Sequence, residues 1–185
     1  MSVGRILRTA SVVALAAFLA VVLQVTIARD VAVLGGAPDL VCILVCSVAL
    51  LRGPEVGAAA GFACGLLLDA VAGLPLGYAA LVYCCVGYGA GRLASSIADR
   101  AALRPLIVIA LGTVAARAGL VLTGFLLPES GVGLDLLVSP ALVTSAALGV
   151  LLGIPLYPAV RRALGESLRP LPRRTGGDDA AAALA

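Results

Sequence analysis

Long apolar stretches separated by short polar segments run through the whole chain. They predict six helices, over residues 9–28, 38–51, 56–71, 77–93, 105–127 and 140–160. A helix that crosses a membrane needs about 20 predominantly apolar residues. The second apolar run is continuous only over residues 40–51, so its helix is either short or preceded by a re-entrant piece. The pattern predicts an all-α polytopic membrane protein, a bundle of about six transmembrane helices.

The first apolar run has a second interpretation. A secretory signal peptide also places basic residues ahead of an apolar segment, and Arg5 and Arg8 precede this one. The run is long for a signal peptide, however, and no clear small-residue cleavage site ends it. These two observations favour a helix that is retained in the protein.

Composition and charge agree with a membrane location. Hydrophobic residues make up 62% of the 185 residues and charged residues 12%, and a soluble domain of this size cannot bury so much apolar surface. All 13 basic residues are arginine. With the N-terminus inside, 11 of them fall on the cytoplasmic side and only Arg29 outside, which predicts N-in and C-in topology. Residues 1–162 then form the transmembrane domain, and residues 163–185 form a basic, disordered cytoplasmic tail.

Three glycines and an acid recur at intervals of four in the third helix, at Gly57, Gly61, Gly65 and Asp69. Residues four apart lie on roughly the same side of a helix. Glycines allow membrane helices to approach closely, so this glycine row (Gly57, Gly61, Gly65) predicts a packing face. A carboxylate at membrane depth needs a reason. Asp69 either pairs with or caps another helix, lies solvated at the helix end, or handles a substrate or proton.

Arg117 lies about midway along the fifth helix with no charged neighbour in sequence. A charge there costs about 2.5–3.5 kcal/mol on insertion scales, which favours a buried partner. Asp69 and Asp39 are the acids near membrane depth. The alternative is that the arginine side chain extends to the membrane interface.

The chain has few residues that could form a catalytic or metal-binding site. Histidine is absent, and the five cysteines fall inside apolar runs without the spacing of a zinc or redox motif. The sequence therefore predicts no catalytic set, metal site, cofactor site or nucleic-acid-binding surface.

Motifs between residues 38 and 91 resemble those of the MreD family of rod shape-determining proteins. They are Pro38-Asp39-Leu40, Leu51-Arg52-Gly53-Pro54, Gly61-Phe62, Gly65-Leu66-Leu67-Leu68-Asp69, Gly73-Leu74-Pro75-Leu76-Gly77 and Gly87-Tyr88. The second half of the chain resembles the family in hydropathy.

The resemblance implies a non-enzymatic protein of the bacterial cytoplasmic membrane that acts in lateral cell-wall elongation. Its expected partners are a single-span MreC-like protein, MreB, RodA and a penicillin-binding transpeptidase, besides membrane lipid. The residues expected in helix packing or partner contact are Pro38, Gly53, Gly57, Gly61, Gly65, Asp69, Pro75, Gly77 and Arg117.

Two other functions stay open at this point. One is the substrate-capture subunit of a vitamin transporter, which is also a small, glycine-rich bundle. The other is an intramembrane enzyme that uses Asp39, Asp69 and Arg117, although a nucleophile or metal site for it is missing from the sequence.

Overall fold

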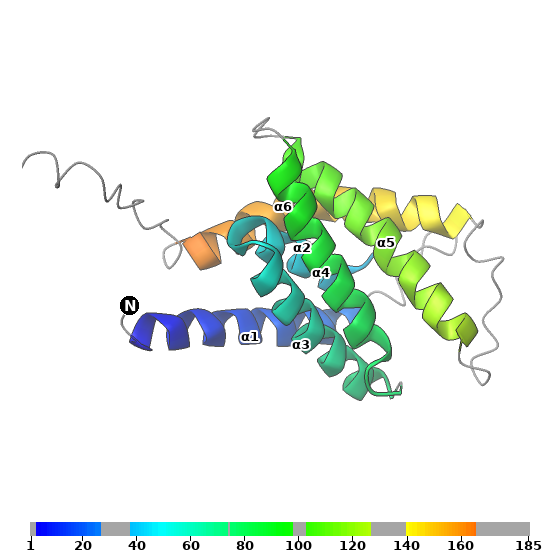
Figure 1. Cartoon of the computed structure of the whole chain (residues 1–185), viewed down its shortest axis with the longest axis horizontal. Helices are drawn as coiled ribbons and strands as arrows, with labels where there is room; N and C mark the ends of the chain where they lie inside the picture. Colours follow the sequence, from blue (N-terminus) through cyan, green and yellow to red (C-terminus); the bar gives the residue numbers. More distant parts are fainter. Residues whose placement is uncertain (1–2, 27–37, 74, 98–102, 127–139, 166–185) are drawn as a thin grey trace, which may run out of the picture.

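The computed structural model of the chain describes residues 3–26, 38–73, 75–97, 103–126 and 140–165. These residues form six α-helices and no strand (Figure 1). The helices are α1 (Val3–Thr26), α2 (Leu40–Arg52), α3 (Pro54–Ala72), α4 (Tyr78–Ser96), α5 (Arg104–Leu126) and α6 (Pro140–Gly165). The all-α class predicted from hydropathy is confirmed for this part of the chain.

The short helix α2 forms the centre of the bundle and contacts all five other helices. Every residue from Val41 to Ala49 is buried. A helix that is apolar all round is suited to such a position, because no side needs to face a polar solvent. Its 13 residues span about 20 Å, less than the roughly 30 Å hydrocarbon thickness of a bilayer. The expectation of a short second helix is confirmed, whereas a re-entrant piece over residues 31–37 would lie outside the described residues.

The other helices surround α2. Helices α3 and α4 form a tightly packed antiparallel hairpin, α5 lies against α4, and α6 lies against α5. In Figure 1, α3 and α4 run obliquely to α1, which lies along one side of the molecule, whereas α6 runs in roughly the same direction as α1. Large apolar side chains point outward from the bundle, for example Phe18, Phe62, Leu81, Leu122 and Leu151.

By length and composition, three helices in the described residues can each cross a membrane. The segments are Pro54–Ala72, Arg104–Phe125 and Val143–Arg162. Shorter apolar helices cover Ala14–Thr26 and Leu40–Arg52. The chain therefore has the features of a membrane bundle.

Proline positions account for the main differences between the predicted and the observed helices. Pro38 was expected in the first turn of the second helix, but it precedes the N-cap residue Asp39. Pro54 was expected in a turn, yet it is the first residue of α3, where its missing N–H leaves no carbonyl without a donor. Pro155 and Pro158 lie inside the last helix, which extends past its predicted end at residue 160 to Gly165. The rest of the predicted tail lies outside the described residues.

Candidate functional site

Asp69 caps the N-terminus of the following helix. Its side chain is fully buried, and its two carboxylate oxygens accept hydrogen bonds from the backbone N–H groups of Gly77 (3.0 Å), Ala79 (2.9 Å) and Ala80 (3.3 Å). The first N–H groups of a helix have no intrahelical acceptor. A carboxylate satisfies them and also interacts favourably with the helix dipole. The N-cap residue of α4, Gly77, has no side chain that could act as a cap. Asp69 therefore supplies the cap of α4 from the neighbouring helix α3.

The turn between α3 and α4 makes this capping possible. Gly73 has the left-handed conformation (φ 69°), and its N–H donates to the carbonyl of Asp69, which ends α3. Gly77 also has a positive φ, of 100°. Glycine adopts such conformations without the steric penalty of a Cβ. Pro75 is exposed and its carbonyl accepts from the N–H of Tyr78. The turn thus reverses the direction of the chain within a few residues and places the N-terminus of α4 next to the carboxylate of Asp69.

The glycine row of α3 lies against the backbone of α4. A Cβ at Gly61 would clash with the carbonyl of Tyr83, and one at Gly65 would lie 2.5 Å from the Cα of Ala80. At Gly57 it would lie 2.6 Å from the Cβ of Ala49 in α2. The two helix backbones therefore approach more closely than any side chain at these positions allows.

Helix α4 contributes glycines to the same interface. A Cβ at Gly87 would clash with the carbonyl of Gly57, and one at Gly91 with the Cα of Pro54. Close approach of both backbones gives extensive van der Waals contact, which is a main source of helix association in lipid. The glycine row therefore packs within the chain, along the whole length of the hairpin. Gly53, with a φ of 92°, joins α2 to α3 just beside it.

A second buried carboxylate, Asp39, lies at the start of α2. It is 1% exposed. One oxygen accepts from the backbone N–H of Cys42 at 2.9 Å and the other from the hydroxyl of Tyr83 at 2.7 Å. The neighbouring N–H of Leu40 donates to the side-chain oxygen of Gln24 in α1, at 2.7 Å. The N-terminus of the central helix is thus held by polar groups from α1 and α4.

The two buried carboxylates contact different parts of α4. Asp69 contacts the first turn of α4, whereas Asp39 contacts Tyr83, five residues after Tyr78. Five residues of helix correspond to about 7.5 Å along its axis. The two carboxylates therefore contact α4 at residues that belong to different turns of the helix.

Arg117 on α5 is half-buried and interacts electrostatically with Asp39 and with Tyr83. Of the two acids considered from the sequence, Asp39 is thus the one with a described interaction with this arginine, while Asp69 hydrogen-bonds to the backbone of α4. Opposite charges close together reduce the free energy of burying each of them. The hydrogen bond between Asp39 and Tyr83 joins α2 to α4, and the charge of Arg117 on α5 acts on both side chains.

Two members of these polar contacts were not singled out from the sequence. Tyr83 is one of three tyrosines spaced five residues apart in the fourth helix. Residues at this spacing spread around a helix, so the spacing did not assign Tyr83 to a particular helix face. Gln24 is an amide in an apolar run, and that isolation is the signal that could have identified it. Tyr78 also contributes, since its hydroxyl donates to the carbonyl of Leu120 in α5 at 2.5 Å.

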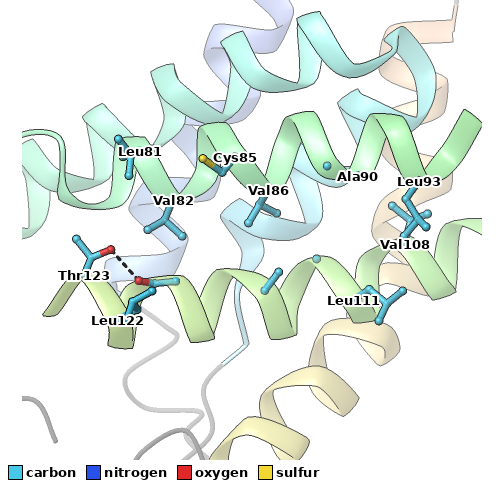
Figure 2. A pocket seen from close by; sticks show the side chains of 14 residues that line it. Leu81, Val82, Cys85, Val86, Ala90, Leu93, Val108, Leu111, Leu122 and Thr123 are labelled. Atoms are coloured by element: carbon cyan, nitrogen blue, oxygen red, sulfur yellow. Dashed lines mark hydrogen bonds between the residues drawn. The ribbon is translucent and has the colours of Figure 1, made fainter. Parts of the chain in front are cut away.

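An apolar groove of 370 Å³ lies between α4 and α5 (Figure 2). Side chains from the two antiparallel helices line it, among them Leu81, Cys85, Leu93, Val108 and Leu122. The hydroxyl of Thr123 at one end already donates to the carbonyl of Gly119. No group of three or more His, Cys, Asp or Glu side chains that could hold a metal ion occurs in the described part of the chain.

Comparison with known proteins gives one family. No curated protein and no solved structure matches the chain significantly. The family model described as rod shape-determining protein MreD matches residues 4–164. This range includes all six helices except for Val3 at the start of α1 and Gly165 at the end of α6. The chain therefore belongs to the MreD family of rod shape-determining membrane proteins.

Proposed function

We propose that the chain is a non-enzymatic, multi-pass component of the bacterial cytoplasmic membrane in the machinery of lateral cell-wall elongation. It assembles there with a single-span MreC-like protein and, through the same complex, with MreB, RodA and a penicillin-binding transpeptidase. The observation that carries the proposal is the match to the rod shape-determining family over residues 4–164. The partners follow from the resemblance of the motifs to that family.

The polar groups of the site support a structural role. Both buried carboxylates accept hydrogen bonds that hold helix N-termini, and the backbone of α4 packs directly against the glycine row. Groups engaged in this way stabilise one arrangement of helices. We infer that Pro38, Gly53, Pro75 and Gly77 shape the turns of this arrangement and that partners contact the outward apolar faces.

The transporter alternative receives less support from the groove. A site that captures a polar vitamin requires several convergent polar groups in its lining. The lining between α4 and α5 is apolar, and its hydroxyl group at Thr123 is already hydrogen-bonded within α5.

For topology we propose six spans with both termini in the cytoplasm, on the basis of the 11-to-1 arginine distribution. Reporters fused after Arg52, Arg104 and Arg174 should then read cytoplasmic, and a reporter within residues 128–139 should read external. An external C-terminus would exclude this arrangement.

The proposed function is tested by depletion and co-purification in the native cell. Depletion should change cell width or shape, and the tagged chain should co-purify with an MreC-like single-span protein from mild detergent. Gly61→Leu, which disrupts the α3–α4 interface, should abolish both complementation and co-purification. Ala63→Leu, at an exposed position on the same helix, is the matched control and should preserve both.

Two results would contradict the proposal. One is normal cell shape together with the absence of an MreC-like partner from the purified complex. The other is a tightly bound vitamin in the purified protein accompanied by ATP-driven uptake of that vitamin in cells.

A further inference from the structure

The groove between α4 and α5 is open on one side. Its lining is apolar, and small residues form its base. A Cβ at Gly89 would meet nothing within 4 Å, so space is left over this part of α4. Leu81, Leu111 and Leu122 at the rim are each more than half exposed. Figure 2 shows these side chains on either side of an elongated gap that follows both helices. In a membrane, such an apolar surface is covered by hydrocarbon.

Two arginines lie about one helical turn beyond groove-lining residues at one end of the groove, by their positions along α4 and α5. Arg92 lies three residues after Gly89 on α4, and Arg104 lies four residues before Val108 on α5. Residues three or four apart share a helix face, so each arginine continues a row of groove-lining residues by one turn. Leu93 and Val108 lie together at one end of the groove, and because the helices are antiparallel, the helix positions of both arginines fall at that same end. The groove is therefore apolar along its length and positively charged at that end.

The dimensions of the groove favour a hydrocarbon chain over a helix. A helix with its side chains is about 10–12 Å across, so even two turns of one displace roughly 1,000 Å³. The groove holds 370 Å³. A single acyl chain is narrower and can follow the gap between two helices.

We propose that this groove is a binding site for an anionic phospholipid. The acyl chain lies between α4 and α5, and the phosphate lies at Arg92 and Arg104. Basic pockets at the ends of membrane helices bind anionic headgroups by charge and by hydrogen bonds from the guanidinium. The site is independent of the proposed function, because it depends only on the groove and on its two arginines.

The absence of tryptophan from the chain allows a direct measurement. A single tryptophan is introduced at the rim by Leu111→Trp, seven residues from Arg104, and the full chain is reconstituted into phosphatidylcholine vesicles. Brominated acyl chains, which quench tryptophan on contact, are carried on phosphatidylglycerol or on phosphatidylcholine. We expect stronger quenching by the brominated phosphatidylglycerol at equal mole fraction.

A matched position on another helix provides the control. Ile154 on α6 is exposed and lies seven residues from Arg161, which is followed by Arg162. Ile154→Trp should therefore report general contact with lipid near two arginines outside a groove. Its quenching should depend little on the headgroup.

Two kinds of variant then test the site itself, each combined with Leu111→Trp. Arg92→Gln and Arg104→Gln should each lower the preference for phosphatidylglycerol roughly fivefold, whereas Arg161→Gln with Arg162→Gln should leave it unchanged. Gly89→Leu should fill the groove and remove the preference for phosphatidylglycerol.

The proposal is overturned by equal quenching from the two headgroups at position 111, or by the same preference at position 154. It is also overturned if the α6 arginine variants reduce the preference as much as the groove variants do. Absence of quenching at position 111 in the parent protein would instead show that a protein segment covers the groove.

Discussion

The hydroxyl of Tyr83 donates a 2.7 Å hydrogen bond to the carboxylate of Asp39. These residues are 44 positions apart in sequence, and the bond joins the second turn of α4 to the start of the central helix. Both side chains are about 1% exposed. In a low-dielectric interior such a charge-assisted bond contributes more than a neutral one.

Tyr83→Phe is expected to destabilise the protein by about 1.5–3 kcal/mol, because it removes a donor from a buried carboxylate and keeps the ring volume. The free energy of unfolding is measured by denaturing-detergent titration in mixed micelles. Tyr88→Phe is the control, since the Tyr88 side chain is 49% exposed. Equal stability of the two variants would mean that the bond contributes nothing measurable.

Asp69→Ala should reduce stability by about 0.5–2 kcal/mol, the range for loss of a helix cap, with a value near the upper end because three backbone donors are left in a buried position. Asp69→Asn keeps one acceptor oxygen and should lose less. Glu55→Ala, at an exposed acid in the first turn of the same helix, should have a smaller effect. An Asp69→Ala variant as stable as Glu55→Ala would contradict the capping role.

A pair of double-mutant cycles distinguishes the possible partners of Arg117. We expect Asp39→Ala and Arg117→Ala to be coupled by about 0.5–3 kcal/mol, because removing one charge makes the other easier to lose. The corresponding cycle of Asp69→Ala with Arg117→Ala should be additive within about 0.5 kcal/mol. Unfolding free energies of all single and double variants give both coupling terms, and the reverse result would assign Arg117 to Asp69.

Gly61→Ala should destabilise the α3–α4 hairpin by about 1–3 kcal/mol, because the new methyl group clashes with backbone that cannot rotate away. At Gly89 a Cβ meets nothing within 4 Å, so Gly89→Ala should change the free energy of unfolding no more than a typical surface substitution does. Thermal unfolding in detergent compares the two. If Gly61→Ala is as stable as Gly89→Ala, the close approach of the two helices is not required for folding.

Much of this fold follows from short-range patterns in the sequence. Hydropathy predicted the helices, and four-residue spacing predicted that the glycine row packs tightly. The row drifts by about 40° per step on a 3.6-residue helix, so spacing alone could not say that Asp69 stays on the side that meets α4 and reaches the N–H groups of Ala79 and Ala80. That contact depends on the path of the turn, which two glycines with positive φ determine.

Contacts between distant helices were not predictable in the same way. The link between Asp39 and Tyr83 depends on how α2 and α4 cross, and nothing in the local pattern of either helix records it. The continuity of α6 through Pro155 and Pro158 has a similar origin. A membrane helix tolerates proline when neighbouring helices and side chains satisfy the freed carbonyl groups, and that depends on the tertiary structure.

The enclosure of α2 has a consequence for how the protein is made. Its N-terminus is completed by Gln24 from α1, which is synthesised earlier, and by Tyr83 from α4, which is synthesised later. A 13-residue helix with a carboxylate at its start cannot settle stably in lipid by itself. We therefore expect α2 to reach its final position only after α4 has been synthesised. Its final placement is thus a late step of assembly, although it is the second helix to be translated.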